Sequence, residues 1–211
     1  TADSAEGGEM EWFVKNGFMV LAPDIIGTGE MGPGVFKGDS YIDSVAYNLW
    51  FASILTGRSI VGIQAADVVR LVNLIKKEYQ TDEICGVAKE EMSPVLLHAA
   101  AFNPEIKRVA LLQPYSSYRS VVVNAEFKSK FIQSTVAGSI GIYDLPDLAA
   151  SLSPRELLLS GITDGNGNSG NMTDIEKDMT VIKKAYSAGQ LQITSAGTVM
   201  ELSESFRNWV E

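Results

Sequence analysis

The stretch EICGVAKEEMSPVLLHAAAFNPEIKRVALLQ, residues 83–113, decides the fold of this chain. It opens with a short apolar run at 83–88, continues with SPVLLHAAAF at 93–102, and closes with a second apolar run at 107–113. Such runs are typical of buried strands, and Pro94 suits the first turn of a helix between them. Two strands joined by a helix over so short a distance lie parallel, because parallel neighbours need a helical crossover. The stretch therefore predicts an α/β fold.

The same alternation of strand and helix continues in both directions along the chain. Further runs that fit buried strands are GFMVLAP (17–23), ELLLSGI (156–162) and LQIT (191–194). Runs with helical spacing of apolar residues are 59–79, 174–189 and 199–210. No repeat, linker or low-complexity tract divides the sequence, so residues 1–211 are predicted to form a single domain. The expected architecture is a three-layer α/β/α sandwich with a mostly parallel sheet.

The composition argues against several classes of function. The chain has 211 residues, with 17 Lys and Arg against 26 Asp and Glu, and a formal net charge of -9. Nucleic acid and anionic lipid would repel this charge, so neither is expected as a partner. The apolar runs are too short to span a bilayer. A single cysteine excludes an internal disulfide and a cysteine-based zinc cluster, and we expect no metal and no cofactor.

The order of landmarks resembles the α/β-hydrolase superfamily, in particular its acetyl-xylan-esterase-like and prolyl-oligopeptidase-like branch. The stretches that carry the resemblance are GFMVLAPDIIGTGE (17–30), LTGRSIVGIQAADVVRLVNLI (55–75), SPVLLHAAAFNPEIKRVALLQPYSSYRSVV (93–122), IYDLPDLAASLSPRELLLSGITDGNG (142–167) and AYSAGQLQITSA (185–196). In that family, the first strands and the oxyanion-hole loop would precede Thr1. The resemblance thus implies the C-terminal part of a larger fold, or a shortened family member, and relatives that act on plant polysaccharide would favour export.

The family's nucleophile sits in a Gly-x-Ser-x-Gly turn between a strand and a helix. Counting forward from Gly86 places the nucleophile at Ala88, whereas counting back from AAAFNP (99–104) places it at Glu90. Neither register supplies Ser or Cys. Ser93 lies nearby, but a hydroxyl at the start of a helix is expected to cap that helix rather than attack an ester. Glu90 could attack as a carboxylate only if a base served the second step, and it is more simply a solvent-facing residue near a helix N-terminus.

The other two members of a catalytic triad are also incomplete. The one histidine, His98, lies inside the helix that follows the turn, whereas the family places its histidine after the last strand. We therefore expect His98 to be a packed or surface residue and not a general base. Asp164 matches the family's acidic position, but an acid without a histidine to orient has no triad role. Cys85 falls within a predicted strand and should be an inert thiol.

Two other stretches have a functional and a structural interpretation. DGNGNSGNMTDIE, beginning at Asp164, loosely matches a calcium loop, but Ser169 and Ile175 replace its essential Gly and Glu, so a polar connection is favoured. The aromatic run at 47–55 could line a sugar pocket, although aromatic residues at helical spacing more often form core. A retained site would lie near PYSSYRSVVV (114–123), because ligands of parallel sheets bind at the strands' carboxyl ends.

These observations predict a catalytically degenerate α/β-hydrolase-like domain with a binding or structural role. Its partners would be a carbohydrate or small-molecule ligand, and an N-terminal segment or a partner chain that completes the sheet. The alternative is an active carboxylic-ester hydrolase, similar to acetyl xylan esterases, which residues outside this chain complete.

Overall fold

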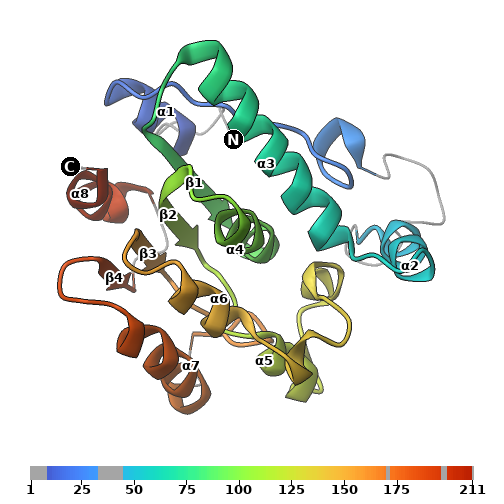
Figure 1. Ribbon diagram of the computed structural model, residues 1–211. Coiled ribbons are helices and arrows are strands. Elements are labelled where there is room, and N and C mark those ends of the chain that lie inside the picture. The colour runs from blue at the N-terminus through green and yellow to red at the C-terminus, as the bar shows by residue number, and fades with distance from the viewer. Residues whose placement is uncertain (1–8, 33–44, 170–171, 196–198, 211) are drawn as a thin grey trace.

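The centre of the protein is a four-stranded, all-parallel sheet in the order β1-β2-β3-β4 (Figure 1). The computed structural model describes residues 9–32, 45–169, 172–195 and 199–210. The strands are β1 (Ile84–Lys89), β2 (Ile106–Leu112), β3 (Glu156–Ser160) and β4 (Leu191–Thr194). Each strand pairs with the next one along the chain, as helical crossovers require. The predicted α/β fold with a parallel sheet is confirmed.

Helices fill most of the connections between the strands. The α-helices in the described ranges are α1 (Glu9–Lys15), α2 (Tyr47–Leu55), α3 (Ile60–Tyr79), α4 (Ser93–Phe102), α5 (Tyr118–Val123), α6 (Leu145–Ser151), α7 (Met172–Ala185) and α8 (Val199–Val210). Short 3₁₀ helices are η1 (Gly29–Met31), η2 (Glu90–Met92), η3 (Ser129–Ser134) and η4 (Ser139–Gly141). The Ser59 side chain caps α3 by accepting a hydrogen bond from the N–H of Gly62, which explains why the predicted long helix begins there.

The sheet lies between two helical layers (Figure 1). α3, α4, α6 and α7 cover one face, and α1 and α8 cover the other. Along β2, Val109 and Leu111 join the larger core beneath α3, α4, α6 and α7, whereas Ala110 and Leu112 join a smaller core with α1 and α8. Because successive side chains of a strand point to opposite faces, this alternation shows that both faces are buried. The predicted three-layer α/β/α sandwich is confirmed.

The smaller core is rich in aromatic side chains, which hold the two end helices together. Phe13 of α1 and Phe206 of α8 are buried with their ring centroids 5.0 Å apart. Arg108 of β2 ties α8 to the sheet, since it donates a hydrogen bond to the carbonyl of Val210 and forms an ion pair with Glu156, Nε to Oε2, at 3.1 Å. A guanidinium at a helix C-terminus satisfies a carbonyl that the helix leaves free.

The predicted strand at 17–23 is wrong. The segment is not a strand, and Met19 and Leu21 are 62% and 54% exposed, although both were expected to be buried. Within the described ranges, residues 19–23 make no backbone hydrogen bond. The sequence has the composition of a strand, but a strand also needs a neighbour, and β1 pairs only with β2 in the described part of the sheet.

The aromatic run at 47–55 forms α2, and its prediction as core is only partly right. Leu49 and Trp50 pack against the larger core. Phe51, however, is 54% exposed, and Leu55 is more exposed still. α2 lies at the periphery, beyond the start of α3 (Figure 1), so only one side of it meets the protein.

Candidate functional site

The two candidate nucleophile positions lie on either side of the end of β1. Ala88 lies within β1, where it pairs with Leu111 of β2. Glu90 follows the strand directly and has a φ of 46°, in the left-handed region. A residue with a side chain pays about 1–2 kcal/mol to adopt such a conformation. The structure thus places a strained, non-glycine backbone at Glu90, where β1 meets the helix.

Two lysines bind the Glu90 carboxylate: Lys128 lies just before η3, and Lys130 lies within it. Lys128 Nζ donates to Oε1 at 2.9 Å, and Lys130 Nζ donates to Oε2. Lys130 also pairs with Glu91 Oε2 at 3.2 Å. Glu90 and Glu91 are therefore partly buried in an ion-pair network, which corrects the expectation that they face solvent.

The lysines keep Glu90 in its charged form. Partial burial acts to raise the pKa of Glu90, but the hydrogen bonds from Lys130 and Lys128 outweigh it and lower the pKa. Burial likewise acts to lower the pKa of Lys130, and its bonds to the two glutamates raise it. Glu90 is thus an ionised carboxylate with both oxygens occupied, and Lys130 is a charged amine rather than a nucleophile.

His98 is buried in α4 and uses both ring nitrogens. Nδ1 lies 2.6 Å from the carbonyl oxygen of Pro94, so it donates its proton there. Nε2 then accepts a hydrogen bond from the Tyr143 hydroxyl at 2.9 Å. Burial lowers the pKa of His98, although the bond to Pro94 opposes this. His98 is 6% exposed and is therefore a packed residue, the first of the two environments expected for it.

Asp164 follows β3 and is only 4% exposed. Its Oδ1 accepts hydrogen bonds from the N–H groups of Asn166 and Asn168, both at 2.9 Å, and its carbonyl accepts one from Gly167. These bonds close a tight loop in the way that aspartate commonly does. The predicted polar connection is confirmed as far as residue 169, and its continuation at 170–171 lies outside the described residues.

The Asp164 loop and the lysine segment contact each other. Lys128 donates its backbone N–H to the carbonyl of Gly165 at 2.8 Å, and Gly165 donates its own N–H to Ser120 Oγ at 2.7 Å. A Cβ added at Gly165 would lie 2.3 Å from the Ser120 carbonyl oxygen, so this close approach needs glycine. Lys128 thus binds Glu90 through its side chain and the Asp164 loop through its backbone.

The candidate residues share a region without forming a triad. No hydrogen bond or ion pair joins any two of Glu90, His98 and Asp164, each of which is bound to other described residues. Sequence reasoning missed the two lysines, since nothing in the local pattern of NAEFKSKF shows that they would meet a glutamate 38 and 40 residues away.

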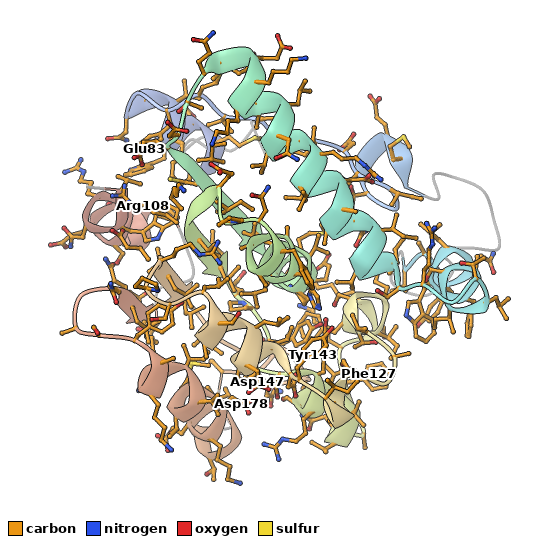
Figure 2. The ribbon with its side chains drawn as sticks, in the orientation of Figure 1. Glu83, Arg108, Phe127, Tyr143, Asp147 and Asp178 are labelled. Carbon is orange, nitrogen blue, oxygen red and sulfur yellow. The ribbon has the colours of Figure 1, made fainter. Side chains whose placement is uncertain are left out.

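The region suggested for a retained site, at 114–123, contributes mainly to the core. Tyr115 and Tyr118 are buried, and burial raises the pKa of both hydroxyls. Asp144 accepts hydrogen bonds from the N–H groups of Tyr118 and Arg119 at 2.6 and 3.0 Å, and so holds the start of α5 against the start of α6. Tyr143, Asp147 and Asp178 lie at this end of the molecule, whereas Arg108 lies on its other side beside α8 (Figure 2).

Cys85, the single cysteine of the chain, lies in β1. Burial raises the pKa of Cys85 to about 11, against an opposing effect of Arg108, which agrees with the predicted inert thiol.

Within the described ranges, no three His, Cys, Asp or Glu side chains lie together in a way that could hold a metal ion. None of the helices in the described part of the chain combines the length and apolar character that a membrane crossing needs.

Comparison with known proteins gives the chain no family. No family model matches the sequence, and neither the curated proteins nor the solved structures include a significant match.

Proposed function

We propose that this chain is an α/β-hydrolase-like domain, similar to the acetyl-xylan-esterase-like branch, that binds or supports a partner and does not hydrolyse esters. The observation that carries this proposal is the ion pairing of Glu90. The turn between β1 and α4 holds an ionised carboxylate whose two oxygens are bound by Lys128 and Lys130.

Covalent catalysis needs a nucleophile and a base within hydrogen-bond reach of each other. His98 is turned toward Pro94 and Tyr143, and Asp164 is bound to its own loop. A carboxylate bound by two ammonium groups is a weak nucleophile, because attack would have to displace them. The described residues therefore support binding better than turnover.

The test is hydrolysis of p-nitrophenyl acetate and of acetylated xylan by the natural polypeptide that contains this chain. We expect rates equal to those of buffer, with no difference between the wild type and Glu90→Ala. Asp67→Ala, at a partly exposed position of α3 where the carboxylate pairs with Arg70, is the matched control for loss of a paired acid. Turnover that Glu90→Ala abolishes and Asp67→Ala preserves would show that the proposal is wrong.

The partner that the structure favours is a strand that completes the sheet beside β1. β1 pairs only with β2 among the described strands, and Val87 on it is exposed. Residues 19–23 make no backbone hydrogen bond to other described residues, while Phe18 and Val20 pack on the smaller core and Ile25 packs on the larger one. The segment thus passes from one face of the sheet to the other. Among the described residues, 19–23 and the edge of β1 away from β2 at 84–88 have no ladder partner, and an added apolar strand would supply one.

Hydrogen exchange in the natural polypeptide tests this partner. With a strand in place, the outward amides of β1 and the amides of 19–23 should exchange slowly. Val87→Lys should abolish that protection, because a charge on an edge strand blocks pairing. Val181→Lys, an equally exposed position on α7, should leave it unchanged. Exchange as fast as in a surface loop in the wild type would rule the partner out.

A carbohydrate ligand is proposed on the exposed side of α2. Phe51 is largely exposed there, and its ring lies beside that of the partly buried Trp50, with the ring centroids 4.8 Å apart. Flat aromatic faces bind the apolar faces of sugars by burial of their large surfaces. Calorimetry with xylan oligosaccharides should detect binding that Phe51→Ala removes and Phe127→Ala, in the loop before η3, does not. Absence of binding to the wild type would exclude this ligand.

The second candidate is an active carboxylic-ester hydrolase completed by residues outside this chain. The strained backbone of Glu90 favours it, because such strain is concentrated at active sites. It predicts ester turnover by the natural polypeptide, with a histidine supplied from outside these residues. The hydrolysis assay above separates the two candidates.

A further inference from the structure

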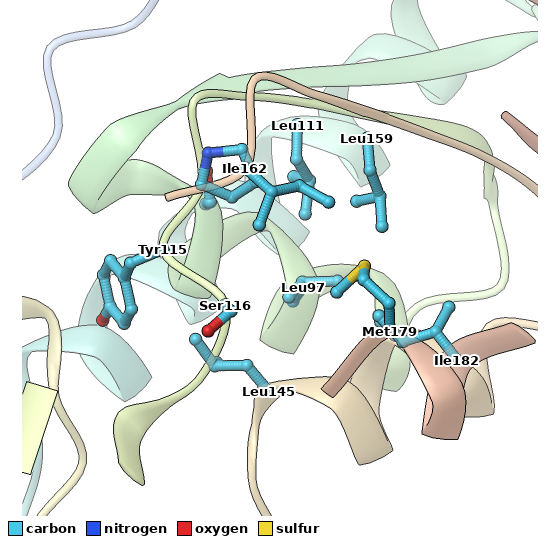
Figure 3. A pocket seen from close by; sticks show the side chains of 12 residues that line it. Leu97, Leu111, Tyr115, Ser116, Leu145, Leu159, Ile162, Met179 and Ile182 are labelled. Carbon is cyan, nitrogen blue, oxygen red and sulfur yellow. The ribbon is translucent and has the colours of Figure 1, made fainter. Parts of the chain in front are cut away.

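A small cavity lies in the larger core, on the face of the sheet covered by α4, α6 and α7. Its volume is about 20 Å³. Its walls are aliphatic for the most part, and they come from both the sheet and the helices (Figure 3). The lining side chains that Figure 3 labels are Leu97, Leu111, Tyr115, Ser116, Leu145, Leu159, Ile162, Met179 and Ile182.

Two buried serines are among the residues that line this mainly apolar space. Ser93 is the first residue of α4 and is 1% exposed, and Ser116 lies in the loop after β2 and is 5% exposed. Neither Oγ has a hydrogen-bond partner among the described residues. The predicted cap at Ser93 is therefore wrong: the residue before it, Met92, occupies the cap position, and no side chain caps α4.

Buried hydroxyls without a partner are rare, because each has given up its bonds to water without replacement. A serine hydroxyl can donate one hydrogen bond and accept two. Cavities with polar groups in their walls hold water, whereas wholly aliphatic ones stay dry. A volume of about 20 Å³ is enough for one water molecule.

We propose that the cavity binds one water molecule, which hydrogen-bonds to Ser93 Oγ and Ser116 Oγ. The site goes beyond the proposed function, since it needs neither a partner nor a substrate. It joins the first turn of α4, three residues after Glu90, to the loop that leaves β2. The water thus links the start of α4, next to the strained turn, to the loop after β2.

A crystal structure of the wild-type protein, at a resolution that shows ordered water, decides the proposal. We expect a single peak of density about 2.5–3.0 Å from both oxygens, the usual O–H···O distance. A cavity without density, or density larger than one water, would overturn the proposal. The wild-type structure suffices for this result, so it does not depend on whether a variant folds.

Thermal unfolding supplies a second, independent readout. If the water is present, Ser93→Ala and Ser116→Ala should each lower Tm by roughly 2–4 °C, the shift expected for one lost hydrogen bond in a chain of this size. The double variant should lose less than the sum, because both serines hold the same water. If the cavity is dry, each substitution removes an unsatisfied hydroxyl, and a raised Tm would contradict the proposal.

Discussion

Replacement of Glu90 by glycine and by alanine tests the strained turn. Both substitutions remove the carboxylate, and with it the hydrogen bonds from Lys128 and Lys130. The loss of these bonds is common to the two variants and cancels when they are compared. What differs is the backbone, since glycine adopts a φ of 46° freely and alanine does not.

The magnitude follows from two opposing effects. Relief of the left-handed conformation favours glycine by about 1–2 kcal/mol. The greater freedom of glycine in the unfolded chain opposes this by about 0.4–1 kcal/mol. From the middle of these two ranges, Glu90→Gly should unfold with a free energy about 0.8 kcal/mol larger than that of Glu90→Ala. At a position with ordinary strand geometry the order is reversed.

Urea unfolding followed by circular dichroism measures this difference. Lys89, one residue earlier, has a φ of -126° and supplies the control pair, in which Lys89→Ala should be more stable than Lys89→Gly. If Glu90→Ala is as stable as Glu90→Gly or more stable, the turn is not strained, and the argument from its geometry fails.

Three further substitutions have expected outcomes. Gly165→Ala should lower the free energy of unfolding by about 1–3 kcal/mol because its Cβ would overlap the Ser120 carbonyl, whereas Gly141→Ala, which has open space around it, should change little; equal effects in urea would contradict this. Burial lowers the pKa of His98 below 6.5, so the unfolded chain binds more protons than the folded one as the pH falls below 6.5. The free energy of unfolding should therefore fall from pH 6.5 toward pH 5, and His98→Gln should flatten this dependence in urea titrations at several pH values. An unchanged slope in the variant would refute the prediction. Arg108→Met should destabilise the protein by about 1–3 kcal/mol through loss of its charged hydrogen bond to the end of α8, and unchanged urea unfolding would show that the bond contributes nothing.

The parallel sheet could be predicted because its strands are short apolar runs separated by helical periodicity. All four observed strands fall within two residues of the predicted boundaries, and all lie in the sheet that the βαβ pattern required. The segment 17–23 has the same composition and is not a strand. Whether it forms a strand depends on whether another strand lies beside it, and the local periodicity of the sequence does not reveal that.

The candidate site could be located but not constructed from sequence. The position after β1 followed from counting along the chain, whereas the left-handed backbone of a glutamate there has no local signal. The partners of Glu90 lie 38 and 40 residues away, and those of His98 include a tyrosine 45 residues away. Such pairs are set by the packing of whole elements, so a single sequence does not specify them.

Intact-mass spectrometry of the natural polypeptide after exposure to an alkyl fluorophosphonate tests the central claim most directly. An activated oxygen nucleophile attacks phosphorus and expels fluoride, so a working hydrolytic site of the serine type gains one phosphonyl group, wherever its histidine comes from. With Glu90 held by two lysines and His98 bound within α4, the account predicts an unchanged mass. Stoichiometric addition to a residue at the turn between β1 and α4 would contradict it and establish an active hydrolase.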